Sequence, residues 1–204
     1  MSPNHRARRV LSLVSLGIVL LAGCTMGSES DAVVEEDTTE EVDSAPEAPV
    51  ELVFTLPTSC RDIVPQEALD KLTSGEVGLL RGPGSGSVEG VYLEGQSPQE
   101  ERGGISCLFG NADETITYTI SVAPMTQATR AEVIDGLLAQ KLNPGQTLDG
   151  GLTYWIQGDQ ETVPAIYNAL YDDAWYEVLI FPGGRLAYEE CESLVTMMRS
   201  HTTS

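Results

Sequence analysis

The stretch Ile105-Ser106-Cys107-Leu108-Phe109, the turn Gly110-Asn111-Ala112-Asp113 and the run Thr115-Ile116-Thr117-Tyr118-Thr119-Ile120-Ser121-Val122 lie near the middle of this 204-residue chain. On both sides of the turn, apolar residues alternate with small or polar ones. Alternation with period two around a Gly-Asn turn is typical of a β-hairpin with one buried face. Residues 105–122 are therefore predicted to form a half-buried hairpin at the centre of the domain.

The segments after the hairpin indicate a helix, three strands and a second helix. Residues 129–142 carry an apolar stripe at helical spacing, with Thr126 or Thr129 as the cap and Thr129 with Glu132 as a candidate capping box. Asn143-Pro144-Gly145 ends this helix. Strands are predicted over 152–157, 165–171 and 174–181, and a final helix over roughly 186–199.

The segments before the hairpin indicate a short helix over residues 64–72 and, after a Gly-Ser loop at 82–87, an edge strand over 88–93. The predicted order is therefore α-β-β-β-α-β-β-β-α. Strands joined by short turns favour antiparallel pairing, and amphipathic helices need a sheet face on which to bury their apolar stripes. We predict an α+β domain in which an antiparallel sheet carries its helices on one face.

The first 24 residues have the pattern of a signal peptide that ends in a lipidated cysteine. His5, Arg6, Arg8 and Arg9 precede an apolar run of thirteen residues, which as a helix spans about 20 Å and is short of the roughly 30 Å membrane core. The run ends in Leu21-Ala22-Gly23-Cys24, which resembles the bacterial lipobox. This resemblance implies cleavage after residue 23 and lipid on Cys24, so that the mature chain is held on the extracytoplasmic face of the cell membrane.

Residues 24–51 have a composition that predicts a disordered tether between the anchor and the domain. From Thr25 to Glu51 there are ten acidic residues, no basic residues and few large apolar ones. Such a segment cannot bury enough surface to offset the entropy of ordering. The chain therefore divides into a signal peptide (1–23), a lipidated cysteine with an acidic linker (24–51) and one extracytoplasmic domain (52–204).

The charge of the chain excludes some partners. Lys and Arg number 11 against 31 Asp and Glu, which gives a formal charge of -20 and a pI near 4.2. Nucleic acid is not an expected partner because its phosphates would be repelled. The membrane is expected as a partner only through the lipid on Cys24.

Three cysteines remain in the domain, and an oxidising compartment favours pairing of two of them. Cys60 with Cys107 is the preferred pair, because it would tie the first helix to the central hairpin across a loop of nearly fifty residues. Pairing of Cys191 with Cys60 or with Cys107 stays open, because connectivity does not follow from sequence. If Cys191 is unpaired, its place on the apolar face of the last helix predicts a buried thiol.

At these residues the chain resembles a known group. Leu56-Pro57-Thr58-Ser59-Cys60 before a helix, and Ile105-Ser106-Cys107-Leu108-Phe109-Gly110 in a hairpin, are similar to small uncharacterised lipoproteins of actinobacterial envelopes. Members of that group commonly have Cys, Trp and Gly where this chain has Cys107, Phe109 and Gly110. The resemblance covers residues 56–142; it implies a Cys60–Cys107 pair and no particular activity.

No catalytic or cofactor-binding motif is found. The two histidines, His5 and His201, lie near the ends of the chain, so Ser-His-Asp and Cys-His centres are not expected. The 82–87 loop lacks the Gly-Lys-Ser/Thr ending of a phosphate loop. Asp149-Gly150-Gly151 supplies only a fragment of a calcium loop. We therefore predict no cofactor and no metal, and no enzymatic activity.

Aromatic residues cluster on the three strands after the middle helix. Trp155, Tyr167, Tyr171 and Trp175 are the candidate contact residues, with Trp175 expected on the sheet face opposite Tyr176. An exposed aromatic strip would suit an envelope protein or a sugar, although another part of the chain could cover it. A binding or interaction module is therefore the first hypothesis; a small-ligand carrier with a pocket between sheet and helices and a carboxylate-based hydrolase are the alternatives.

Overall fold

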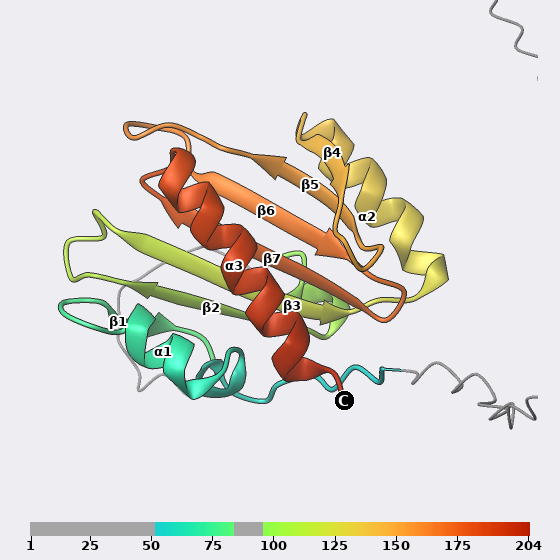
Figure 1. Ribbon diagram of the computed structural model, residues 1–204, viewed down its shortest axis with the longest axis horizontal. Coiled ribbons are helices and arrows are strands. Elements are labelled where there is room, and N and C mark those ends of the chain that lie inside the picture. The colour runs from blue at the N-terminus through green and yellow to red at the C-terminus, as the bar shows by residue number, and fades with distance from the viewer. Residues whose placement is uncertain (1–51, 84–95) are drawn as a thin grey trace, which may run out of the picture. The chain divides into compact units, whose positions relative to one another are not determined.

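The computed structural model describes residues 52–83 and 96–204, which form an α+β domain with a seven-stranded antiparallel sheet (Figure 1). The strand order is β1-β2-β3-β7-β6-β5-β4. The strands are β1 (Gly78–Arg81), β2 (Ile105–Gly110), β3 (Thr117–Pro124), β4 (Asn143–Gln146), β5 (Leu152–Ile156), β6 (Ala165–Leu170) and β7 (Ala174–Phe181). The predicted fold class and the central 105–122 hairpin are confirmed. The signal peptide, Cys24, the acidic linker and the predicted 88–93 strand lie outside the described residues.

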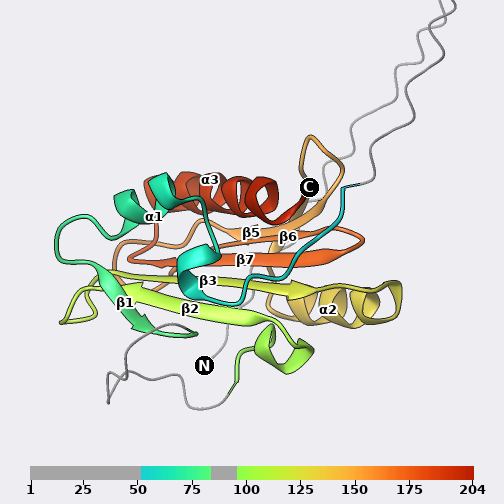
Figure 2. The same ribbon diagram turned by 90° about the horizontal axis from the view of Figure 1, so that it is seen from below.

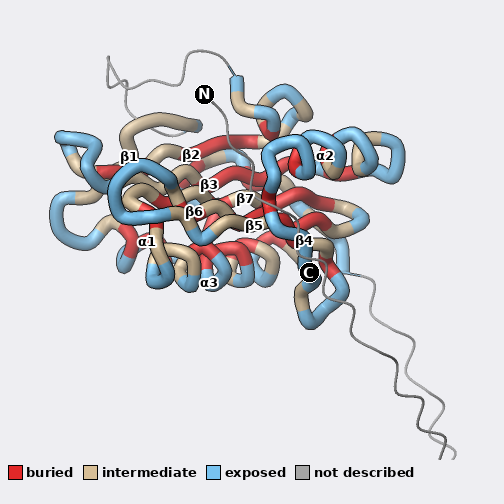
Figure 3. The backbone as a smooth tube through the Cα atoms, turned by 90° about the horizontal axis from the view of Figure 1, so that it is seen from above, coloured by how far each residue is buried: buried red, intermediate tan, exposed pale blue. Residues whose placement is uncertain are grey.

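The two halves of the sheet meet at its centre, where β3 pairs with β7. Their antiparallel register runs from Thr117 opposite Phe181 to Pro124 opposite Ala174. Since β3 and β7 are far apart in sequence, this pairing closes the domain and covers two edges that would otherwise be open. Figure 3 shows the buried residues concentrated along these central strands.

The helices lie on both faces of the sheet, which corrects the expectation that they share one face. α1 (Gln66–Leu72) and α3 (Arg185–Thr202) cover one face, and α2 (Gln127–Ala139) covers the other (Figure 2). The alternation of β7 explains both layers, because Tyr176, Val178 and Ile180 belong to the core under α3, whereas Trp175 packs with Val133 and Leu137 of α2.

Two strands differ from the predicted order. The helix α2 ends at Ala139, before Asn143-Pro144-Gly145, and these three residues begin the unpredicted edge strand β4, in which all four residues are exposed. Pro144 is compatible with this edge position because a strand at the rim has one side without hydrogen-bond partners. The other unpredicted strand, β1, pairs with β2 on the opposite rim.

The N-terminal end of α2 is capped by Thr126, which is one of the two predicted caps. The Thr126 hydroxyl accepts a hydrogen bond from the Thr129 amide, and the Thr129 side chain reciprocates toward the Thr126 backbone. A capping box therefore forms between Thr126 and Thr129, and the alternative of Thr129 with Glu132 was wrong.

Cys60 and Cys107 form a disulfide that joins the 3-10 turn η1 (Cys60–Asp62) to β2, with Cα atoms 5.6 Å apart. Both residues are fully buried. Cys191 is a free, buried thiol, and burial is the main reason that its pKa is raised. The preferred pairing and the buried state of the third cysteine are both confirmed.

Candidate ligand-binding cleft

The predicted contact residues do not form one exposed strip. Trp175 is 3% exposed and lies under α2, where its indole N–H donates to Asn168 Oδ1 at 2.8 Å. Its predicted face was right, but the helix on that face covers it. Trp155, Tyr167 and Tyr171 instead lie on the face of α3.

Trp155 is partly buried by stacking on α3. Its ring centroid lies 4.9 Å from that of Tyr188, and Tyr188 also meets Tyr167 edge-on with centroids 5.9 Å apart. Aromatic pairs in these arrangements stabilise a helix–sheet contact. Trp155 therefore has a packing role in this structure.

Tyr167 and Tyr171 are brought together in a cleft of about 410 Å³ between α3 and the turn that joins β4 to β5. The turn contributes residues 146–149, and α3 contributes Glu192, Thr196, Arg199 and Ser200. These four helical residues follow the i, i+4, i+7, i+8 pattern and so share one face of α3. The cleft lies between sheet and helix and is open to solvent, because Leu148, Asp149 and Glu192 on its walls are exposed.

The β4–β5 turn is held in place by short hydrogen bonds. The Gly151 amide donates to the Thr147 hydroxyl at 2.7 Å, and the Tyr171 hydroxyl donates to Asp149 Oδ1 at 3.0 Å. A Cβ atom at Gly151 would lie 2.8 Å from the Tyr171 ring, so glycine is required for this close approach. The Asp149 carboxylate therefore lies at the rim of the cleft, where it accepts a hydrogen bond from Tyr171.

Arg199 supplies the positive charge of the cleft and is held on two sides. Its Nη1 lies 2.7 Å from Asp173 Oδ1, and its guanidinium carbon lies 4.2 Å from the centroid of the Tyr171 ring. Only 14% of its side chain is exposed. The guanidinium is thus a fixed group whose charge is partly balanced from behind by Asp173.

Tyr167 contributes a hydroxyl group to the wall of the cleft. The residue is 5% exposed, and among the residues that the structure describes no hydrogen bond is made to its hydroxyl. Burial, followed by the nearby Glu192 carboxylate, raises the pKa of Tyr167. The hydroxyl therefore stays protonated near neutral pH and faces the cleft as a free donor.

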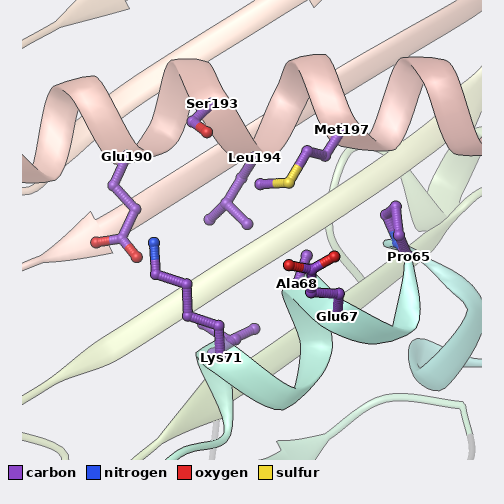
Figure 4. A pocket seen from close by; sticks show the side chains of 9 residues that line it. Pro65, Glu67, Ala68, Lys71, Glu190, Ser193, Leu194 and Met197 are labelled. Atoms are coloured by element: carbon purple, nitrogen blue, oxygen red, sulfur yellow. The ribbon is translucent and has the colours of Figure 1, made fainter.

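A larger groove of about 620 Å³ runs between α1 and α3 (Figure 4). Leu194 and Met197 of α3 point toward Ala68 of α1, and the rim residues Lys71 and Glu190 point toward each other. Opposite charges already face one another at this rim. The groove contains none of the predicted contact residues, and its Ser193 offers a control position for substitutions in the cleft.

A buried carboxyl group lies on the other sheet face. Glu177 occupies the centre of β7, opposite Ser121 on β3 and Asn168 on β6. Although part of the residue remains exposed, burial raises the pKa of its carboxyl to about 6, and the side chains of Gln99 and Asn168 offset only part of the rise. This group matters for stability rather than for the cleft.

The described residues hold neither a metal-binding cluster nor a membrane-spanning helix. No group of three or more His, Cys, Asp or Glu side chains within 52–83 and 96–204 is placed to hold a metal ion. In those same ranges no helix has the length and apolar character needed to span a membrane. Comparisons with protein families, with curated proteins and with solved structures found no match.

Sequence reasoning identified two of the cleft residues, Tyr167 and Tyr171, and missed Asp149, Glu192 and Arg199. Asp149 was noted only as part of an incomplete calcium-loop pattern, and Arg199 only as the end of the last helix. The helical spacing from Glu192 to Arg199 was a usable signal, because it predicts a shared face. What the face would meet depends on the tertiary pairing of α3 with β6.

Proposed function

We propose that this protein is a lipid-anchored binding domain of the cell envelope, held at the extracytoplasmic face of the membrane by Cys24 and taking a small polar ligand into the cleft of α3. The signal peptide pattern and the lipobox-like Leu21-Ala22-Gly23-Cys24 support the anchor, and the acidic 24–51 segment supports a tether. The domain itself supplies the binding site.

One observation carries the binding proposal: Tyr167 is 5% exposed as a residue and lines the cleft, and its hydroxyl has no hydrogen-bond partner among the described residues. Because this hydroxyl makes no hydrogen bond within the described residues, it can donate to and accept from a ligand oxygen or nitrogen in the cleft. The volume of about 410 Å³ falls within the range of small-molecule sites, about 300–1,000 Å³.

The anchor is tested by replacing Cys24 with Ser in cells fed a radiolabelled fatty acid. The native protein is expected to carry label and to sediment with membranes, while Cys24→Ser carries none and is released from the membrane fraction. Equal labelling of both proteins would contradict lipidation at this cysteine.

The binding site is tested with full-length protein in detergent and a small-molecule extract of the envelope, using saturation-transfer NMR to detect bound components. Ser200 and Ser193 offer a matched pair, because both are exposed serines on α3 but Ser200 lines the cleft and Ser193 lines the α1–α3 groove. Ser200→Phe should abolish the signals and Ser193→Phe should keep them. Signals that survive in Ser200→Phe would refute the cleft as the site.

The same experiment addresses the hydrolase alternative. Asp149 and Glu192 both line the cleft, and two carboxylates in one cleft are the minimum for glycoside hydrolysis. Binding alone leaves the bound components chemically unchanged over time. Appearance of cleavage products that depend on Asp149 and Glu192 would favour the hydrolase.

A further inference from the structure

We propose that the ligand of the α3 cleft is an uncharged, hydroxyl-rich molecule, either a free sugar or a sugar unit of a glycan. This inference deepens the proposed function and rests on it. The inference rests on three properties of the polar groups that line the cleft: their donor and acceptor character, their charge and their hydrogen bonds within the protein.

The donors and acceptors of the cleft are mixed. The free Tyr167 hydroxyl can both donate and accept, the Asp149 and Glu192 carboxylates accept, and Arg199 donates. A ligand hydroxyl is the simplest group that donates and accepts at once, so several hydroxyls on one small scaffold match this set. A ligand with acceptors alone would leave the two carboxylates unmatched, and a ligand with donors alone would leave Arg199 unmatched.

Internal bonds hold these groups in position. The Thr196 hydroxyl donates to the Glu192 carbonyl at 2.9 Å, and the Ser200 hydroxyl donates to the Thr196 carbonyl at 3.0 Å. Their oxygens therefore face outward mainly as acceptors. Together with the fixed Asp149 and Arg199, they form a site that needs little reordering when a ligand binds.

The charges disfavour an anionic ligand. Asp149 and Glu192 lie at the cleft, and Asp173 balances Arg199, the one cationic side chain that lines it among the described residues. The chain as a whole carries a formal charge of -20. A phosphate or carboxylate would therefore meet repulsion both on approach and in the cleft.

The remaining groups offer a cationic ligand no free aromatic face and disfavour a fully apolar ligand. The Arg199 guanidinium lies over the Tyr171 ring, so the aromatic face that would otherwise attract an ammonium group is already occupied by a cation. An apolar ligand would bury the Tyr167 hydroxyl and the two carboxylates without hydrogen bonds. A neutral sugar avoids both costs.

The test uses the full-length protein in a detergent without a sugar headgroup and a set of probes with one ring skeleton. Methyl glycosides of glucose, galactose and mannose and their disaccharides are the neutral probes, and glucuronic acid and glucosamine are the charged ones. Saturation-transfer NMR at millimolar concentration should detect at least one neutral probe and no glucuronic acid. Binding of glucosamine without any neutral probe, or binding of none, overturns the inference.

Three variants locate the binding. Tyr167→Phe should weaken the affinity for the neutral probe about tenfold, because one ligand hydrogen bond is lost. Ser200→Phe should abolish the binding, and Ser193→Phe should leave it within about twofold. An unchanged affinity in Tyr167→Phe would contradict the assigned contact, as would equal losses in the two serine variants.

The outcomes separate this inference from the proposed function. If envelope components bind in a manner that Ser200→Phe abolishes, while no neutral sugar binds, the cleft is a binding site and the assigned ligand class is wrong. If neither envelope components nor sugars bind in the cleft, both proposals fail.

Discussion

The ring of Tyr167 packs in the core, while its hydroxyl group is the part of the side chain that we propose binds the ligand. Its ring is buried on the sheet and contacts Tyr188 edge-on, but its oxygen has no partner among the described residues. Tyr176 provides the opposite case on the same face, because its hydroxyl is 2.7 Å from the Thr202 hydroxyl in a buried position. Replacing each tyrosine with phenylalanine is therefore expected to change the free energy of unfolding by different amounts.

We expect Tyr167→Phe to change the free energy of unfolding by less than about 0.5 kcal/mol, because no intramolecular hydrogen bond is lost. Tyr176→Phe should lose about 1 kcal/mol or more, because a buried bond is removed. Urea unfolding of the two variants in parallel measures both values. A loss in Tyr167→Phe as large as that in Tyr176→Phe would show that the Tyr167 hydroxyl is structural.

Glu177 predicts a dependence of stability on pH. Burial raises the pKa of its carboxyl from 4.5 to about 6, so the folded protein binds this proton more tightly than the unfolded chain. The contribution of this proton to stability is full below pH 4.5 and is lost as the pH rises through 6. The difference amounts to about 2 kcal/mol.

Glu177→Gln should remove this dependence and should be more stable than the native protein at pH 7, by up to about 2 kcal/mol. Unfolding free energies of both proteins at pH 5 and pH 7 provide the measurement. The native protein should lose stability relative to Glu177→Gln as the pH rises. Parallel pH profiles for the two proteins would mean that the carboxyl is effectively solvated.

At the scale of elements, alternation and turn residues allowed most of the sheet to be predicted. β2, β3, β5, β6 and β7 each have a buried face or are buried throughout, and such strands carry a readable pattern. β4 is exposed at all four residues and therefore has no apolar pattern to read. Its existence depends on pairing with β5, which sequence does not show.

The middle helix shows why faces were harder to predict than elements. Its expected apolar stripe included Val133, Leu137 and Leu138, but only Val133 and Leu137 are buried, and Leu138 is 48% exposed. The crossing from β3 to β4 can pass on either side of the sheet, and the periodicity of α2 does not depend on which side it takes. Trp175 is buried because α2 lies on its side of the sheet, which the sequence did not predict.

The disulfide gives a prediction at the same scale. Cys60 and Cys107 close a loop with a sequence separation of 47, and loss of such a bridge costs about 2–5 kcal/mol. Unfolding midpoints of native, reduced native and Cys60→Ala/Cys107→Ala protein should show equal destabilisation of the last two. A midpoint that reductant does not change would contradict a stabilising role for the bridge.

At the scale of the whole molecule, the cleft joins residues that lie far apart in the sequence. Asp149 comes from the β4–β5 turn, Tyr167 from β6 and Arg199 from α3, and only the complete sheet with its helix places them around one volume. The sequence indicated Tyr167 and Tyr171 as contact residues but did not indicate which residues lie next to them in the cleft. The overall negative charge, in contrast, was readable at once and still limits the ligand classes.

The most direct test of the central claim is a thermal unfolding measurement of native and Tyr167→Phe protein with and without the bound fraction of the envelope extract. A ligand that binds the folded state raises the unfolding temperature, and the rise grows with the ratio of ligand concentration to Kd. The account predicts a clear rise for the native protein and a much smaller one for Tyr167→Phe, from equal starting temperatures. Equal rises in both proteins would contradict a ligand site at the Tyr167 hydroxyl.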